Sequence, residues 1–334
     1  MTRSDHHFYQ RLAEDALSGV ALAQEDGLRL LQDDSLELLS LLQAAFQVRR
    51  HHFGRRVRVQ ILNNVQNGFC PEDCHYCAQA VDSEAPINTY RIKSDEEILT
   101  DAERACQAGA YRYCMVLSGR GPNPDRLARM AALVRRIKAT WPLEVCLSAG
   151  FIDQGMATTL REAGLDRYNH NLNTAEGHYG AICHTHTYQD RLATLQAARS
   201  VGLEVCSGLI VGMGESAADL WQVANTLRQL QARSIPINFY VHIPGNRLGV
   251  VEPAMTPEQC LRIMCLFRFA NPDAELRAAG GREVHVRSLS PLLLYPANAL
   301  FSAGYLNVGG QSTEEVMRMI VDAGFEVERC EEAG

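Results

Sequence analysis

The chain has 334 residues, of which 46% are hydrophobic and 21% are charged, a composition close to that of an average soluble globular protein. Its 32 basic and 39 acidic residues give a formal net charge of −7, which excludes a nucleic-acid binder that works through a generally basic surface. No apolar stretch approaches the roughly 20 residues of a membrane span, and the opening MTRSDHHFYQ lacks the apolar segment of a signal peptide. We therefore expect a cytoplasmic protein that does not bind membranes.

Short β-prone runs alternate along the chain with longer stretches of helical periodicity, a pattern typical of a parallel sheet. The expected strands cover 57–64, 111–117, 143–150, 166–173, 203–212, 235–243, 274–281 and 299–305. Ser94 begins one of the intervening helices with a Ser-x-x-Glu capping box, and Thr256 precedes a proline at the first position of another. Eight alternations over about 250 residues favour an α/β fold of the (β/α)8 TIM-barrel type.

The strand pattern divides the chain into three parts. Residues 1–55 are predicted to be an N-terminal helical extension, 56–324 the barrel, and 325–334 a C-terminal tail. Barrel enzymes build their active sites from the loops that follow the strands, so those loops are where chemistry is expected.

Three cysteines, Cys70, Cys74 and Cys77, form a C-x3-C-x2-C run directly after the first expected strand. In a chain without an export signal, such clustering favours metal binding or catalysis over disulfides. Zinc in a structural site needs a fourth ligand, and none stands at finger-like spacing, although His75 lies within the run. A 4Fe–4S cluster on three cysteines leaves one iron open to an external ligand, which favours reaction chemistry over electron storage.

Several expected strands carry polar or sulfur-bearing side chains where a barrel interior normally holds Val, Ile and Leu. These residues are Cys114, Cys146, Asn169, Asn171, Cys206, Asn238 and Arg277. Asn169 and Asn171 are two positions apart and share one face of their strand. A buried guanidinium such as that of Arg277 requires an anionic partner. The convergence of these groups on the barrel axis predicts an occupied internal site.

The cysteine run, with Tyr76 just before its last cysteine, resembles that of the radical S-adenosylmethionine (SAM) superfamily. Further blocks from about residue 51 to 325 resemble the biotin synthase family. They are CPEDCHYCAQ at 70–79, YRYCM at 111–115, LDRYNHNLNT at 165–174, CSGLIVGMGE at 206–215, IPIN at 235–238 and GGREVH at 280–285. Several blocks in the same order are far more specific than one motif.

The resemblance implies an enzyme that converts dethiobiotin to biotin by inserting sulfur between two saturated carbons. Cys70, Cys74 and Cys77 would hold a 4Fe–4S cluster that cleaves SAM to a 5′-deoxyadenosyl radical. A 2Fe–2S cluster, the implied sulfur donor, would be held by Cys114, Cys146, Cys206 and Arg277. The predicted catalytic residues are the first three cysteines and Arg277.

The same resemblance assigns the predicted cofactor and substrate contacts. SAM would contact Tyr76, Asn171, Asn173, Gly212 and Gly214. The ureido ring of dethiobiotin would meet Asn169 and Asn238. The family often has Asp at position 173, whereas this chain has Asn. Because Asn carries no charge, a charge-dependent role is not implied at this position. A flavodoxin-type or ferredoxin-type reductant and a homodimer are also implied.

Other interpretations remain open. One is a different radical SAM barrel, of the hydrogenase-maturation or lipoyl synthase type; another is an iron–sulfur electron carrier or a zinc-binding structural protein. The GMGESA run at 212–217 has the form of a dinucleotide fingerprint but lacks the acidic residue about 20 positions later. No role is assigned to the remaining cysteines, which are Cys106, Cys183, Cys260, Cys265 and Cys330. A solvated or substrate-adjacent loop is expected at His178, His184 and His186.

Overall fold

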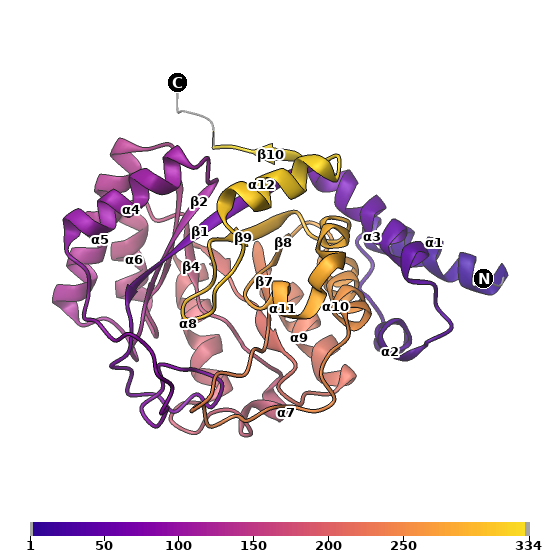
Figure 1. Cartoon of the computed structure of the whole chain (residues 1–334), viewed down its shortest axis with the longest axis horizontal. Helices are drawn as coiled ribbons and strands as arrows, with labels where there is room; N and C mark the ends of the chain where they lie inside the picture. The colour runs from indigo at the N-terminus through magenta and orange to yellow at the C-terminus, as the bar shows by residue number, and fades with distance from the viewer. Residues whose placement is uncertain (1–2, 331–334) are drawn as a thin grey trace.

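Parallel strands close into a ring at the centre of the computed structural model, which describes residues 3–330 (Figure 1). The ring order is β1-β2-β3-β4-β5-β7-β8-β9, and β9 pairs back with β1. The strands are β1 (Arg56–Gln66), β2 (Arg112–Leu117), β3 (Glu144–Ser148), β4 (Arg167–Asn169), β5 (Glu204–Cys206), β6 (Leu209–Val211), β7 (Ser234–Phe239), β8 (Glu275–Ala278) and β9 (Ala299–Ser302). Every expected strand is present, and the predicted (β/α)8 barrel is confirmed.

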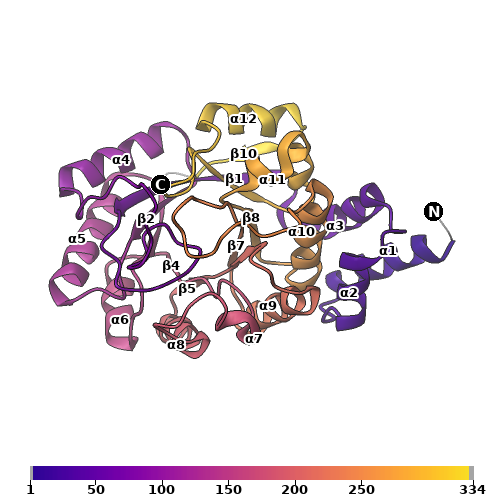
Figure 2. The ribbon, with the colours of Figure 1, turned by 60° about the horizontal axis from the view of Figure 1, so that its bottom comes forward.

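Helices surround this ring (Figure 2). They are α4 (Asp95–Gln107), α5 (Pro124–Thr140), α6 (Gln154–Glu162), α7 (Glu176–Tyr179), α8 (Tyr188–Ser200), α9 (Ala217–Gln229), α10 (Pro257–Ala270), α11 (Arg282–Val286), the 3-10 helix η1 (Arg287–Leu294) and α12 (Thr313–Asp322). Ser94 caps α4 in the predicted capping box, and α10 begins at Pro257 with Thr256 as its N-cap. No helix in the described part of the chain is both long and apolar enough to cross a membrane.

The residues before the barrel form α1 (Arg3–Leu17), α2 (Gln24–Gln32) and α3 (Leu38–Phe53), which stand to one side of it beside α10 in Figure 2. Arg262 of α10 donates to the carbonyl oxygens of Leu30 and Leu36 at 3.0 and 2.6 Å. After α12, β10 (Glu326–Glu328) pairs with the start of β1. The last four residues of the predicted tail, 331–334, lie outside the described range.

The fifth expected strand, 203–212, is divided into β5 and β6 by Ser207 and Gly208. A Cβ atom on Gly208 would lie 1.8 Å from the carbonyl oxygen of Pro236 on β7. The backbone here therefore approaches β7 more closely than any side chain allows. The Gly208 amide donates to Asn171 Oδ1 at 3.1 Å, so the close approach also positions a predicted site residue.

Gly208→Ala should lower the free energy of unfolding by about 3 kcal/mol, because the new methyl group can enter only if β6 and β7 separate. Gly177→Ala is the matched control: no atom lies within 4 Å of its Cβ position, so the change should stay below about 1 kcal/mol. Urea unfolding of both variants measures the difference. Equal stabilities would mean that the close approach at Gly208 does not matter.

Candidate functional site

Cys70, Cys74 and Cys77, here called the outer site, lie in the loop after β1, at the end of the barrel where the carboxyl ends of the strands meet. The His75 amide donates to the Ile182 carbonyl at 2.9 Å, and the Leu248 amide donates to the His75 carbonyl at 2.8 Å. Burial raises the pKa of the Cys77 thiol to about 11. Burial also raises the pKa of Cys70, and the hydrogen bond with Cys183 raises that of Cys74, so the three thiols would become thiolates together only beside the positive charge of a metal core.

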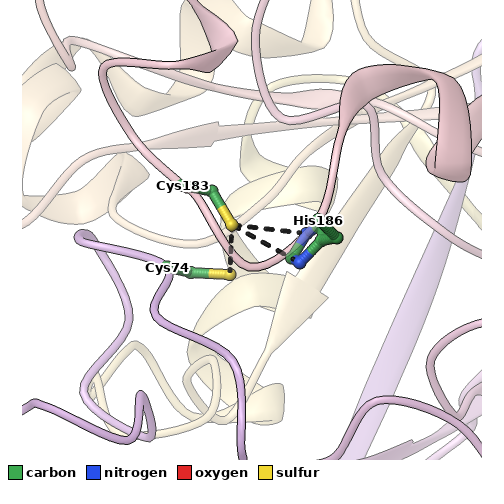
Figure 3. A group of neighbouring side chains, drawn as sticks. All are labelled: Cys74, Cys183 and His186. Atoms are coloured by element: carbon green, nitrogen blue, oxygen red, sulfur yellow. Dashed lines mark hydrogen bonds between the residues drawn. The ribbon is translucent and has the colours of Figure 1, made fainter.

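A fourth thiol lies beside the outer site. Cys183 Sγ is 3.9 Å from Cys74 Sγ and 3.4 and 3.6 Å from the two ring nitrogens of His186 (Figure 3). The hydrogen bond between the two thiols lowers the pKa of Cys183 and raises that of Cys74. From the sequence, Cys183 is expected to be an ordinary loop thiol without a role, and it lies 109 residues from Cys74 along the chain.

The loop that carries Cys183 folds back onto the outer site, so of the two expected alternatives, a solvated or a substrate-adjacent loop, the first does not hold at His186, whereas the His184 side chain is 55% exposed. The His186 side chain is only 1% exposed, and its Nδ1 lies 2.6 Å from Glu72 Oε2. Asp73 accepts hydrogen bonds from the backbone amides of His184 and Thr185, each at 3.0 Å. These bonds outweigh burial and hold the pKa of Asp73 well below its ordinary value. Two carboxylates beside the cysteines thus fix the shape of the loop.

Cys114, Cys146, Cys206 and Arg277, here called the inner site, come together inside the barrel. Parallel register pairs Cys114 with Cys146 across β2 and β3, and the Arg277 guanidinium lies 3.4 Å from Cys206 Sγ. All four residues are buried. Hydrogen bonds to Cys114 and Cys206 raise the pKa of Cys146, while a hydrogen bond from Cys146 and the charge of Arg277 keep the pKa of Cys206 well below its ordinary value.

The donor set of the inner site fits an anionic metal cluster. Arg277 Nε is buried and has no hydrogen-bond partner among the described residues. Its guanidinium lies over the Phe301 ring, 4.6 Å from the centroid. A cavity lined by Cys114, Cys146, Arg277 and Asn169 adjoins these groups. Cysteine sulfurs and a buried guanidinium whose Nε has no partner among the described residues, all around one cavity, are suited to an iron–sulfur core.

A second pocket opens between the outer and inner sites. Its lining includes Tyr76, Cys77, Asn171, Asn173, Asn238, Tyr240, Gly280 and Tyr305. Tyr305 also lines the inner cavity, so the two spaces are adjacent. Gly212 and Gly214 are not among the lining residues; both have positive φ after β6, near Met255 and His178 respectively.

Some hydrogen-bonding atoms of the Asn side chains in and beside this pocket already have partners within the protein. Asn238 donates to the Leu209 carbonyl and accepts from the Gly280 amide, both at 3.1 Å. Asn169 donates to Asn171 Oδ1 at 3.2 Å, so the two side chains do meet, although β4 ends at Asn169 and Asn171 lies beyond the strand expected to carry both. Asn173 has a φ of 70° and donates to the Tyr76 hydroxyl. The unused donors and acceptors of these groups remain available to a ligand.

Solved structures with the same architecture include methylornithine synthase, with a TM-score of 0.80, 21% identity and coverage of 95% of this chain and 97% of that one. The FeFe-hydrogenase maturase HydG of Carboxydothermus hydrogenoformans has a TM-score of 0.81 at 16% identity, over 98% of this chain and 81% of that one. At these identities the likeness shows the fold alone.

Comparison of sequences is more specific. Residues 65–227 match the model of the radical SAM superfamily, and residues 236–326 match the Biotin and Thiamin Synthesis associated domain. A biotin synthase of Magnetococcus marinus is 62% identical over 321 residues, 96% of this chain and 100% of that protein. One of Acaryochloris marina is 52% identical over 93% of this chain and 90% of that protein. The chain therefore belongs to the biotin synthase family, within the radical SAM superfamily.

Proposed function

We propose that the chain converts dethiobiotin to biotin by radical sulfur insertion. The observation that carries the proposal is the presence of two separate cysteine groups in one barrel, with a pocket between them. The outer site stands at the mouth of the barrel and the inner site lies within it. A substrate in the pocket would contact both, as a reaction that activates carbon and then supplies sulfur requires.

Membership of the superfamily implies a 4Fe–4S cluster and SAM, and the outer site is where we place them. Cys70, Cys74 and Cys77 would hold the cluster, which would supply the electron needed to cleave SAM to a hydrogen-abstracting radical. Tyr76, Asn171 and Asn173 would contact SAM in this proposal; Gly212 and Gly214, which the resemblance also assigns to SAM, are not in the lining of the pocket. In this proposal the barrel walls would shield the reacting groups from water.

The inner site would hold a 2Fe–2S cluster, the proposed source of sulfur. Cys114, Cys146, Cys206 and Arg277 are its proposed ligands, supported by their convergence and by the unpartnered Arg277 Nε. Asn169 and Asn238 would hold the ureido ring through the carboxamide positions that the backbone leaves free. In this proposal all of these residues belong to the barrel at 56–324, which lies between the extension at 1–55 and the tail at 325–334.

Anaerobic incubation of the reconstituted protein with dethiobiotin, SAM and a flavodoxin-type or ferredoxin-type reducing system tests the proposal. Biotin and 5′-deoxyadenosine, both measured by mass, are the expected products. Formation of 5′-deoxyadenosine without biotin would instead favour another radical SAM reaction, of the hydrogenase-maturation or lipoyl synthase type. If neither forms while iron is bound, the electron-carrier alternative gains support. Size-exclusion chromatography with light scattering tests the proposed homodimer.

Asn173→Ala should raise the KM for SAM about tenfold, because it removes the hydrogen bond to Tyr76 and places Ala in a left-handed conformation. Asn173→Asp is the control: its carboxylate replaces the Nδ2 donor but can accept a hydrogen bond from the Tyr76 hydroxyl, and the family often has Asp there. The rate of 5′-deoxyadenosine formation against SAM concentration measures the effect. An unchanged KM in the alanine variant would remove Asn173 from the proposed SAM site.

A further inference from the structure

A buried carboxylate, Glu275, lies next to the inner site and has no role in the function proposed above. Glu275 and Arg277 are two positions apart on β8, so their side chains point to the same face of the strand. Glu275 is only 2% exposed. A carboxylate is rarely this deeply buried unless it is paired, so its partners indicate what it does.

The first partner is Arg277, which Glu275 holds in two ways. Arg277 Nη2 lies 3.4 Å from Glu275 Oε1. The same Nη2 donates to Ser234 Oγ at 2.6 Å, and Ser234 Oγ donates to Glu275 Oε1 at 2.9 Å. Because Nη2 is also the atom 3.4 Å from Cys206 Sγ, the carboxylate fixes the edge of the guanidinium that faces this thiol.

The second partner is Gln60 on β1, which only β9 separates from β8 in the ring. Gln60 Nε2 donates to Glu275 Oε1 at 2.7 Å. The other end of the same carboxamide, Gln60 Oε1, lies 3.7 Å from Cys114 Sγ. One carboxylate therefore orients a group beside Cys114 and a group beside Cys206.

Glu275 also separates buried positive charges. Arg112 donates to both of its oxygens, at 2.6 and 2.9 Å, and Arg167 Nη1 lies 3.8 Å from Oε1. Without the carboxylate, Arg112 and Arg277 would lose the negative charge that both contact. Like charges in a buried site repel strongly, so the Arg277 guanidinium would move away from its place.

We propose that Glu275 is a positioning residue for the inner site, which holds Arg277 and Gln60 in the orientation that a bound cluster requires. The inference rests on the proposed function, because it takes Arg277 to be a cluster ligand. Partners that orient a metal ligand typically change metal affinity roughly 10- to 100-fold when they are replaced. The same loss is expected for the inner cluster when Glu275 is replaced.

The test is Glu275→Gln in the full chain, reconstituted anaerobically. Retention of the inner cluster against a chelator, measured by iron count and Mössbauer spectrum, should fall roughly 10- to 100-fold. The outer cluster and 5′-deoxyadenosine formation should be unchanged. Inner cluster that remains should have a higher midpoint potential, because a nearby negative charge has been removed. If the substitution only destabilised the fold, the inner cluster that remains bound would keep the parental midpoint potential.

Glu144→Gln is the matched control. Glu144 also pairs with Arg112 and Arg167, at 2.5 and 3.5 Å, and its ion pairs among residues 3–330 do not include Arg277. It should therefore keep the inner cluster and its potential near those of the parent. Glu275→Gln combined with Arg112→Gln removes one charge of each sign, so it should fold even if the single variant does not. The double variant should still lose the inner cluster.

Each outcome bears on a different claim. If the parent protein holds no inner cluster, the proposed function fails and this inference fails with it. If the parent holds the cluster, and the Glu275 variants that fold keep it with parental affinity and potential, only the role of Glu275 is overturned. An equal loss in Glu144→Gln would also overturn that role, since a general effect of buried charge would then explain the result.

Discussion

Cys70→Ala should abolish SAM cleavage, with 5′-deoxyadenosine falling below detection. A 4Fe–4S cluster that must keep one iron open has only three protein thiolates, so the loss of one leaves two irons without a protein ligand. The assay is anaerobic incubation with SAM and reductant, with 5′-deoxyadenosine measured by mass. Cys106→Ala is the control, because Cys106 lies on α4, away from both cysteine groups, and should cleave SAM at the parental rate.

The position of Cys183 decides which of the three cysteines should be replaced in this experiment. It lies 3.9 Å from Cys74 but belongs to a different loop, so Cys74→Ala could leave a thiol close to the vacated position. Cys70→Ala avoids this complication and is the cleaner variant. Parental SAM cleavage in Cys70→Ala would contradict the assignment of the outer site.

Cys146→Ala should separate the two halves of the reaction: SAM cleavage remains measurable, but no biotin forms. Cys146 lies between Cys114 and Cys206 and shares hydrogen bonds with both, so its loss removes the central ligand of the inner site. The same incubation, with dethiobiotin added and both products measured, tests this. Biotin formation by Cys146→Ala would show that the inner site does not deliver sulfur.

Strand positions and the inner thiols could be predicted from the sequence because both follow local patterns. Alternating β-prone and helical segments fix where strands lie, and parallel register then places Cys114 beside Cys146. Ser94 likewise predicts the start of its helix through Glu97, three positions later, and Thr256 does so through the proline that follows it. These features depend on short separations along the chain.

What could not be predicted depends on contacts between distant segments. His186 is buried because Glu72 and Asp73 draw its loop onto the outer site, and no local pattern encodes that pairing. The break between β5 and β6 arises from the approach of Gly208 to Pro236, which no residue pattern reveals. Glu275 reads as an ordinary strand residue until the barrel closes and brings Arg112, Ser234 and Gln60 around it.

The most direct measurement is the fate of sulfur placed in the inner site. The protein is reconstituted so that the sulfide of the inner cluster carries a heavy isotope, and all free sulfide is then removed from solution before dethiobiotin and SAM are added. The biotin of the first turnover should carry the heavy sulfur, and the Mössbauer signal of the inner cluster should decline in step with its formation. Unlabelled biotin formed while that signal stays constant would contradict the account.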